Sequence, residues 1–389
     1  MRAGSRLRAA VVAALLGALI AGCGSSGSPS ASSTTTATAT ATASKAPYAA
    51  RGPYAVGYTT TRLAGGRRVV IWYPADPSRT SGHPVETVDL VSLLSPALQA
   101  KVPAGDRVLY PTKAYRDAPA ATGHAPYPIV LFSHGFAGYP EQSVSLTTHL
   151  ASWGFVVAAP DHVERSLDGL LGTAATGVPK STDTAVLAAT LDLLTGDAPL
   201  ADGLHSLVDP NRVAVIGHSA GAGAAYAFAS ADARVKSWIS YSVGFGGQSG
   251  PAPTAPDKPG MVMLGTKDGI IPPASSRQVY AGMRPPKYLV EIGGAGHLVF
   301  SDICLIARSQ GGITGIARAI HLPIPPSLLK LGSDGCTSDH PDPAKAFPAI
   351  DQLSVAFLRW SLHLDPEPVG LSTDAVAGLG AQVTVQHVG

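Results

Sequence analysis

Charged residues are scarce in this chain of 389 residues: they make up 14% of the sequence, against 45% hydrophobic residues. Basic and acidic residues nearly balance, with 25 against 26 once the three arginines before residue 9 are set aside. The sequence contains no run of Lys and Arg that would track a phosphate backbone, and no Walker-type glycine loop. We therefore expect neither a nucleic-acid nor a nucleotide partner.

Cysteine is also scarce, and the first of three, Cys23, directly follows an apolar N-terminal stretch. A basic segment through Arg8 precedes an apolar run over 9–21, which is too short to span a bilayer comfortably. The sequence I-A-G-C at 20–23 resembles the lipobox of bacterial lipoproteins. We expect residues 1–22 to be a lipoprotein signal peptide and Cys23 to be lipidated; an ordinary cleaved signal followed by a chance cysteine is the alternative.

Residues 23–50 consist largely of Ser, Thr, Ala and Gly. Such a segment cannot bury enough apolar surface to fold, so we expect a flexible tether. The chain is then exported and held by lipid at the outer face of the bacterial cell membrane, or secreted. Export places the other two cysteines, Cys304 and Cys336, where disulfides persist, and we expect them to pair rather than remain as two buried thiols.

Short apolar runs alternate with helical segments from residue 127 onward, which predicts an α/β fold with a mostly parallel sheet covered by helices on both faces. We expect a single catalytic domain over 51–365 and a C-terminal tail over 366–389. Residues 76–123 are rich in Pro, Asp and Ser, and we expect them to form a long surface connection. The expected strands are 67–73, 127–132, 155–159, 212–216, 235–241, 261–264 and 288–292, and the main expected helices are 142–153, 184–194, 220–230, 275–282 and 345–363.

The central motif is G-H-S-A-G at 217–221, which follows an apolar strand and precedes a helix of small residues. A sharp strand-to-helix turn of this kind exposes the hydroxyl of Ser219 at a helix start, as a nucleophile requires. A serine hydroxyl needs a base, and the base needs an orienting acid. Asp268 and His297 each follow a later apolar strand, so both fall at the sheet edge where α/β proteins bind ligands.

These observations favour Ser219, Asp268 and His297 as a catalytic triad. A turn aspartate at 268 and a structurally satisfied histidine at 297 are the simpler alternatives. His218 adjoins Ser219 along the chain, which directs its ring away from the hydroxyl, so we interpret it as structural.

Acyl transfer also needs two main-chain N–H donors for the developing oxyanion. We assign them to Ala220, which follows the nucleophile, and to Phe136 in the loop S-H-G-F-A-G at 133–138. The alternative for that loop is a glycine turn without a catalytic role. His162 follows another strand and is a candidate for substrate contact.

At these motifs the chain resembles the α/β-hydrolase superfamily, and within it the bacterial dienelactone-hydrolase-like and platelet-activating-factor-acetylhydrolase-like esterases. The resemblance implies the α/β-hydrolase fold and a serine ester hydrolase that forms an acyl-enzyme on Ser219. It implies a small-molecule or lipid ester as substrate, no cofactor and no metal site.

Three other functions stay open at this point: a cell-envelope acyltransferase with the same triad, a polyester or cutin hydrolase, and a non-catalytic surface lipoprotein. Polyester hydrolases are similar in size and export, but this chain differs from them in having His134 in the oxyanion loop and Ala220 after the nucleophile. Residues 298–344 adjoin His297 and are candidates for one wall of the substrate pocket. The oligomeric state is left open.

Overall fold

A computed structural model describes residues 45–389, apart from 108, 175–176, 197–200, 247–252 and 323. The expected signal peptide (1–22), the lipidation site Cys23 and most of the expected tether (23–50) lie outside the described residues. Packing against the domain begins earlier than the sequence suggests, because Tyr48 is buried and its N–H donates to Gln352 Oε1 at 2.7 Å. The tether therefore cannot extend to residue 50.

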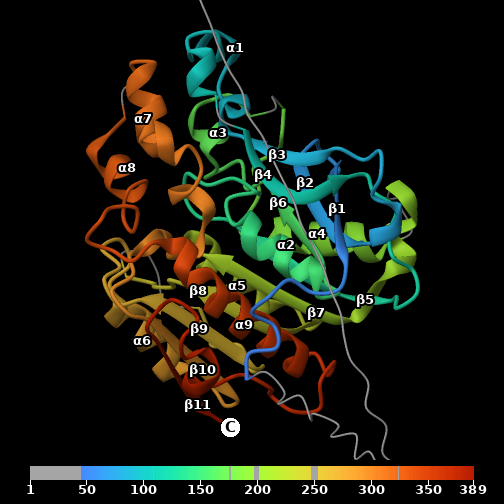
Figure 1. Cartoon of the computed structure of the whole chain (residues 1–389). Coiled ribbons are helices and arrows are strands. Elements are labelled where there is room, and N and C mark those ends of the chain that lie inside the picture. The colour runs from blue at the N-terminus through green and yellow to red at the C-terminus, as the bar shows by residue number, and fades with distance from the viewer. Residues whose placement is uncertain (1–44, 108, 175–176, 197–200, 247–252, 323) are drawn as a thin grey trace, which may run out of the picture. The chain divides into compact units, whose positions relative to one another are not determined.

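The centre of the sheet consists of parallel strands, as predicted (Figure 1). Their order is β6-β5-β7-β8-β9-β10. The strands are β5 (Tyr127–Ser133), β6 (Val156–Pro160), β7 (Val208–His218), β8 (Val235–Tyr241), β9 (Gly260–Gly265) and β10 (Lys287–Ile292). The carboxyl ends of these strands share one edge of the sheet, so the loops that follow them meet there.

Four strands extend the sheet beyond β6, in the order β2-β1-β4-β3. They are β1 (Ala55–Arg62), β2 (Arg68–Ala75), β3 (Val85–Asp89) and β4 (Leu109–Arg116). The expectation of a long surface connection over 76–123 is therefore wrong, since β3 and β4 lie within it. These strands were missed because polar residues and prolines interrupt the alternation that marks an edge strand.

The opposite edge corrects a second expectation. Residues 366–389 are not a tail outside the domain, because β11 (Val383–Val388) pairs antiparallel with the whole of β10, and α10 (Thr373–Val376) packs beside it. Val376 and Val383 are buried. The main chain of β11 pairs with the outer edge of β10, whose N–H and C=O groups would otherwise be unpaired.

Helices cover both faces of the sheet, as predicted. On one face Val130 and Phe132 of β5 pack in a core with α2 (Val144–Ser152) and α9 (Pro343–Ser361). On the other face Ile129 and Leu131 pack with α4 (Asp183–Thr195), α5 (Ala220–Ala231) and α6 (Pro273–Gly282). Successive residues of β5 thus point to opposite cores, which is why the buried strands are apolar throughout.

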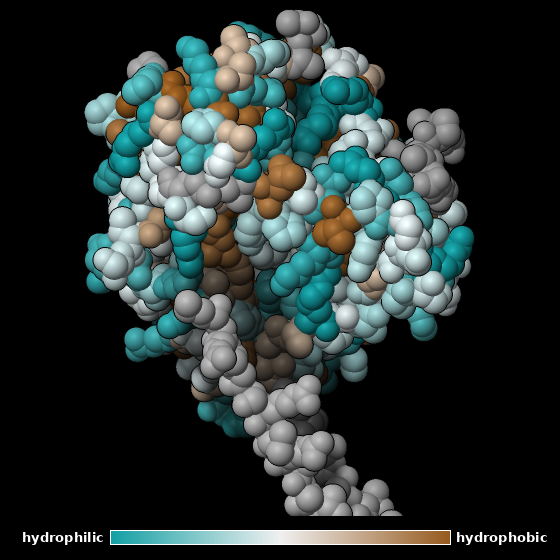
Figure 2. Space-filling view, turned by 45° about the horizontal axis from the view of Figure 1, so that its top comes forward, coloured by the Kyte–Doolittle hydropathy of each residue, from teal (hydrophilic) through white to brown (hydrophobic). Residues whose placement is uncertain are grey.

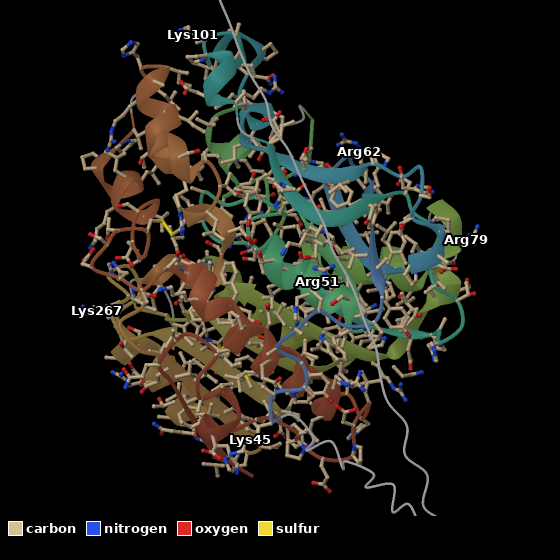
Figure 3. All side chains as sticks on the ribbon, in the orientation of Figure 1. Lys45, Arg51, Arg62, Arg79, Lys101 and Lys267 are labelled. Carbon is tan, nitrogen blue, oxygen red and sulfur yellow. A yellow bond between two sulfur atoms is a disulfide. The ribbon has the colours of Figure 1, made fainter. Side chains whose placement is uncertain are left out.

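Four short helices, α1, α3, α7 and α8, gather beyond the end of the sheet where β5 and β7 terminate (Figure 1). Their bounds are α1 (Pro96–Gln99), α3 (Leu167–Leu170), α7 (Gly312–Ala319) and α8 (Pro326–Leu331). Short 3-10 turns occupy Pro77–Arg79, Leu90–Leu93, Ala104–Asp106, Ala201–Leu207, His297–Phe300, Asp302–Cys304 and Arg308–Gln310. Basic side chains are spread over the domain rather than gathered in one patch, as the six labelled in Figure 3 illustrate.

Candidate active site

Ser219 forms the turn between β7 and α5. Its φ of 59° and ψ of −121° lie in a region that residues with a side chain rarely adopt. Two glycines permit the turn: a Cβ at Gly217 would lie 2.1 Å from the carbonyl oxygen of Gly221, and a Cβ at Gly221 would lie 2.0 Å from that of Ser133. Only glycine fits at these positions, so the spacing of the motif is a steric requirement.

The three residues proposed as a triad are brought together by hydrogen bonds. Nε2 of His297 lies 2.8 Å from Oγ of Ser219, and Nδ1 of the same ring lies 2.8 Å from Oδ2 of Asp268. The imidazole is completely buried and the Asp268 residue is 5% exposed. This is the geometry in which a histidine can take the hydroxyl proton while a carboxylate orients its ring.

The environment of Asp268 keeps it ionised. Burial by itself would raise the pKa of this carboxyl, but the hydrogen bond and charge interaction with His297 hold the pKa below its ordinary value. The main-chain N–H groups of Ile270 and Ile271 donate to its Oδ1 at 2.9 and 2.8 Å, so the carboxylate cannot rotate away. Asp268 therefore always presents an acceptor to the histidine.

The backbone of His297 is held on both sides. Its N–H donates to Oδ1 of Asp334 at 2.5 Å, and its carbonyl oxygen lies 3.0 Å from Nε2 of His218. Oε1 of Gln142 accepts the main-chain N–H of Gly135, so the side-chain NH₂ of Gln142 donates to Nδ1 of His218. The His218 proton then resides on Nε2 and is donated to His297.

His218 is thus a support for the base and not a second base. Burial, followed by the nearby His297, lowers the pKa of the His218 imidazole to about 3. Its ring stays neutral at any pH at which the domain would work, in agreement with the structural role predicted for it. Asp334 and Gln142 were missed by the sequence analysis, because nothing in the residues around either one marks it as a neighbour of the base.

The two predicted oxyanion donors have no internal acceptor. Within the described residues, neither the N–H of Phe136 nor that of Ala220 has a hydrogen-bond partner. The oxyanion loop passes close to the nucleophile, since a Cβ at Gly135 would lie 3.3 Å from Cβ of Ser219. Both N–H groups are therefore free to receive an oxygen beside Ser219.

His162 does not reach this site. Its side chain is completely buried, with Nε2 at 3.0 Å from Ser133 Oγ and Nδ1 at 2.8 Å from Asp183 Oδ1, and it does not line the cavity beside Ser219. Burial and the adjacent Arg165 lower the pKa of His162 to about 3. The expectation of substrate contact is wrong, because the strand end directs this ring beneath the oxyanion loop and not into the cavity.

A cavity of about 530 Å³ opens beside Ser219 and His297. Besides the oxyanion loop, Gln142 and the residues around Ser219 and His297, its walls come from three places in the sequence: residues 90–94, residues 167–171, and the segment 298–332 that includes α7 and α8. The part of the chain proposed as a wall beside His297 thus lines the cavity. Cys304 and Cys336, at the two ends of this wall, are joined by a disulfide, visible as the yellow bond in Figure 3.

Within the described ranges of the chain, no group of three or more His, Cys, Asp or Glu side chains is arranged to hold a metal ion. In that same part of the molecule, no helix has both the length and the hydrophobicity needed to cross a membrane.

Two family models match parts of the chain. The model described as chlorophyllase matches residues 111–261, which include the oxyanion loop and Ser219. The model described as platelet-activating factor acetylhydrolase, isoform II, matches residues 40–170. A search of curated proteins found no match.

Among solved structures, the chain is similar to a ferulic acid esterase from Streptomyces cinnamoneus, with a TM-score of 0.61 and 25% sequence identity. The similarity covers 87% of this chain and 98% of the esterase. Both family models and this structure concern ester hydrolases. The chain is a serine ester hydrolase with the α/β-hydrolase fold.

Proposed function

We propose that this hydrolase cleaves carboxylic esters through an acyl-enzyme on Ser219. His297 takes the proton from the Ser219 hydroxyl as its oxygen attacks the ester carbonyl. The tetrahedral oxyanion accepts hydrogen bonds from the N–H groups of Phe136 and Ala220. His297 then gives its proton to the departing alcohol, and Asp268 stabilises the imidazolium in between.

Water completes the cycle by the same route. His297 removes a proton from a water molecule, which attacks the acyl carbonyl, and the proton returns to Ser219 as the acid leaves. The observation that carries this proposal is the pair of 2.8 Å contacts from His297 to Ser219 and to Asp268, at the wall of a cavity large enough for a substrate. Cavities of this size are typical of small-molecule sites.

Labelling with a fluorophosphonate probe tests the nucleophile. The wild-type enzyme should be labelled and should release p-nitrophenol from p-nitrophenyl acetate, whereas Ser219→Ala should lose labelling and at least about 10⁴-fold in kcat. A matched control is Ser361→Ala, a buried serine on α9 that does not line the cavity. Labelling that survives in Ser219→Ala, or is absent from the wild type, contradicts the proposal.

The site of action is a separate part of the proposal: the enzyme is exported and held at the membrane by lipid on Cys23. The lipobox-like sequence at 20–23 and the disulfide between Cys304 and Cys336 support it, because disulfides persist outside the cytoplasm. In a bacterial host the full chain should sediment with membranes, and Cys23→Ser should release it. Equal amounts of both proteins in the soluble fraction would refute the anchor.

A further inference from the structure

The cavity beside Ser219 is apolar almost throughout. Apart from residues of the site and its supports, it is lined mainly by Leu, Ile, Val and Ala side chains, and none of its lining residues is Asp, Glu, Lys or Arg. Thr314 and Ser327 are the other side chains with a polar group on the described walls. A charged or strongly polar substrate group would lose its hydration here without gaining a partner, which is costly.

The apolar residues come from opposing elements and not from one surface. Leu167 and Leu170 are the first and last residues of α3. Opposite them, Ile316 and Ala317 belong to α7, and Leu328 belongs to α8. Figure 2 shows that hydrophilic and neutral residues dominate the face in view, with hydrophobic residues in small groups. The opposing apolar side chains of α3, α7 and α8 can therefore enclose a ligand next to the nucleophile.

We propose that the preferred substrates are uncharged esters with an apolar chain of eight or more carbons, bound between α3 and the α7–α8 wall. This inference rests on the proposed function. An acetyl group would leave most of the 530 Å³ to water, whereas each methylene added to a chain in this cavity is removed from water. The chain can belong to the acyl or to the alcohol part of the ester, and the test separates the two.

Two ester series test this substrate class, each kept below its critical micelle concentration. The first varies the acyl chain of p-nitrophenyl esters from two to ten carbons, and the second varies the alcohol of acetate esters over the same range. We expect kcat/KM to rise about threefold or more per added carbon in one of the series. Flat or falling values in both series would overturn the inference.

The wall itself is tested by Ala317→Leu, which places a larger side chain in the cavity from a buried position on α7. The ratio of kcat/KM for the eight-carbon ester to that for the two-carbon ester should fall about tenfold. Ala319→Leu is the matched control, because Ala319 is exposed on the same helix and does not line the cavity. An unchanged ratio in Ala317→Leu would also contradict the inference.

Different results would contradict the acyl-enzyme mechanism and the proposed substrate class. If Ser219-dependent acetate hydrolysis is present but chain length has no effect, the substrate class is wrong and the acyl-enzyme mechanism stands. If fluorophosphonate labelling is absent, the mechanism fails first.

The buried Arg165, which follows β6, contacts the oxyanion loop. Its NH1 lies 3.0 Å from the carbonyl oxygen of Gly135 and also donates to the carbonyl of His134, while its Nε lies 3.1 Å from Oδ1 of Asp183. The guanidinium thus binds two successive carbonyls of the oxyanion loop and is itself held by a carboxylate. The loop returns one bond, from the N–H of Ala137 to the carbonyl of Arg165 at 2.8 Å.

Arg165 is one of three donors to the carbonyl oxygen of Gly135, together with Nδ1 of His134 at 2.9 Å and the N–H of Gly138 at 3.2 Å, and these bonds set where the oxyanion donor points. In a trans peptide the C=O and N–H of one plane point in opposite directions. The carbonyl of Gly135 belongs to the same plane as the N–H of Phe136, so holding that oxygen against Arg165 turns the N–H toward the opposite side. Gly135 and Phe136 both line the cavity.

The geometry points to Arg165 as a positioning residue for the oxyanion hole. Replacing it would remove one of the three bonds that hold the peptide between Gly135 and Phe136 and so loosen the donor; complete loss of one oxyanion donor costs about 10²–10³-fold in kcat. We expect Arg165→Met to lower kcat by about 10-fold or more while KM changes less than about threefold. Its affinity for a trifluoromethyl ketone, which forms a tetrahedral adduct on Ser219, should fall in parallel.

Arg67→Met is the matched control, because Arg67 is an equally buried arginine that pairs with Glu164 and does not contact the oxyanion loop. It should lower stability without lowering kcat. If Arg165→Met fails to fold, Arg165→Lys keeps the charge but lacks the Nε that pairs with Asp183 and the NH2 that donates to Ser133 Oγ, and it should show a smaller loss of kcat and of ketone affinity. Loss of stability alone in the Arg165 variants, with kcat and ketone affinity within about threefold, would overturn the assignment.

Discussion

The carboxylate of Asp334 joins the loop of the base to the loop of the acid. Its Oδ1 accepts the main-chain N–H of His297 at 2.5 Å, and its Oδ2 accepts the N–H of Gly269 at 3.2 Å. Gly269 directly follows Asp268. One side chain outside the triad therefore fixes the distance between the two residues that activate Ser219.

Removing this link should reduce activity more than stability. We expect Asp334→Ala to lower kcat by about 10–100-fold, since small displacements of catalytic groups are costly, and Asp334→Asn to lose less because it keeps one acceptor oxygen. Steady-state kinetics with a p-nitrophenyl ester measures both. Asp339→Ala, an exposed carboxylate in the same segment, should leave kcat unchanged; an equal loss in both variants would argue against a specific role for Asp334.

Backbone strain at Ser219 predicts an unusual order of stabilities. Because its φ is 59°, Ser219→Gly should be more stable than Ser219→Ala by about 1 kcal/mol, although both should be inactive. Urea unfolding measures the difference. At Ser354, inside α9, the order should be reversed, with the glycine variant less stable. Equal stabilities of the two Ser219 variants would mean that the turn carries no strain in solution.

Asp302 predicts a pH dependence of stability. This buried carboxyl accepts hydrogen bonds from Ser145 and Tyr110, yet burial raises its pKa to about 6. Between pH 4 and 6 the unfolded chain has this group ionised while the folded protein keeps it protonated, so unfolding releases a proton and stability falls as pH rises. Above about pH 7 both states are ionised and the effect is complete.

Comparison with Asp302→Asn isolates this effect from the other titrating groups. The stability advantage of the wild type over the variant should shrink by about 2 kcal/mol between pH 4 and 7, as measured by denaturant unfolding at several pH values. A constant difference over this range would show that Asp302 titrates normally.

The disulfide between Cys304 and Cys336 closes a loop with a sequence separation of 32 residues. In the chain-entropy model such a loop is worth about 4 kcal/mol, so the double variant Cys304→Ser, Cys336→Ser should lose about that much stability. Asp334 lies two residues before Cys336, and kcat should therefore fall as well. Full activity in a destabilised variant would indicate that the wall keeps its position without the bond.

Much of the fold and the core of the site could be predicted from local patterns. Apolar runs such as 127–132 are buried on both sides and can hardly be anything but central strands. The turn at Ser219 sterically requires glycine at positions 217 and 221, and the sequence has glycine at both. Asp268 and His297 each follow a strand, and parallel strands bring their carboxyl ends to one edge, so chain order was enough to select them.

The edges of the sheet were harder to predict, because edge strands are only partly buried. β3 and β4 contain exposed and polar positions, and β11 follows a stretch that resembles a tail. A position just after a parallel strand does not by itself place a side chain in the site. His162 follows a strand as Asp268 does, but its ring points under the oxyanion loop. Arg165 lies three residues later, in the same loop after β6, but it was not predicted to be near the site.

The sequence by itself determined the α/β architecture, the strained turn at Ser219 and the order of nucleophile, acid and base, because each depends on residues close together in the chain or on strand polarity. Only the tertiary structure determined which residues hold the catalytic groups in place and which residues line the pocket. Asp334 meets His297 across 37 positions and Arg165 meets Gly135 across 30. The apolar cavity is lined by the catalytic loops and by three further segments that are far apart in the sequence. Such contacts depend on side-chain direction and on how loops pack over the sheet, and neither has a periodic signal in the sequence.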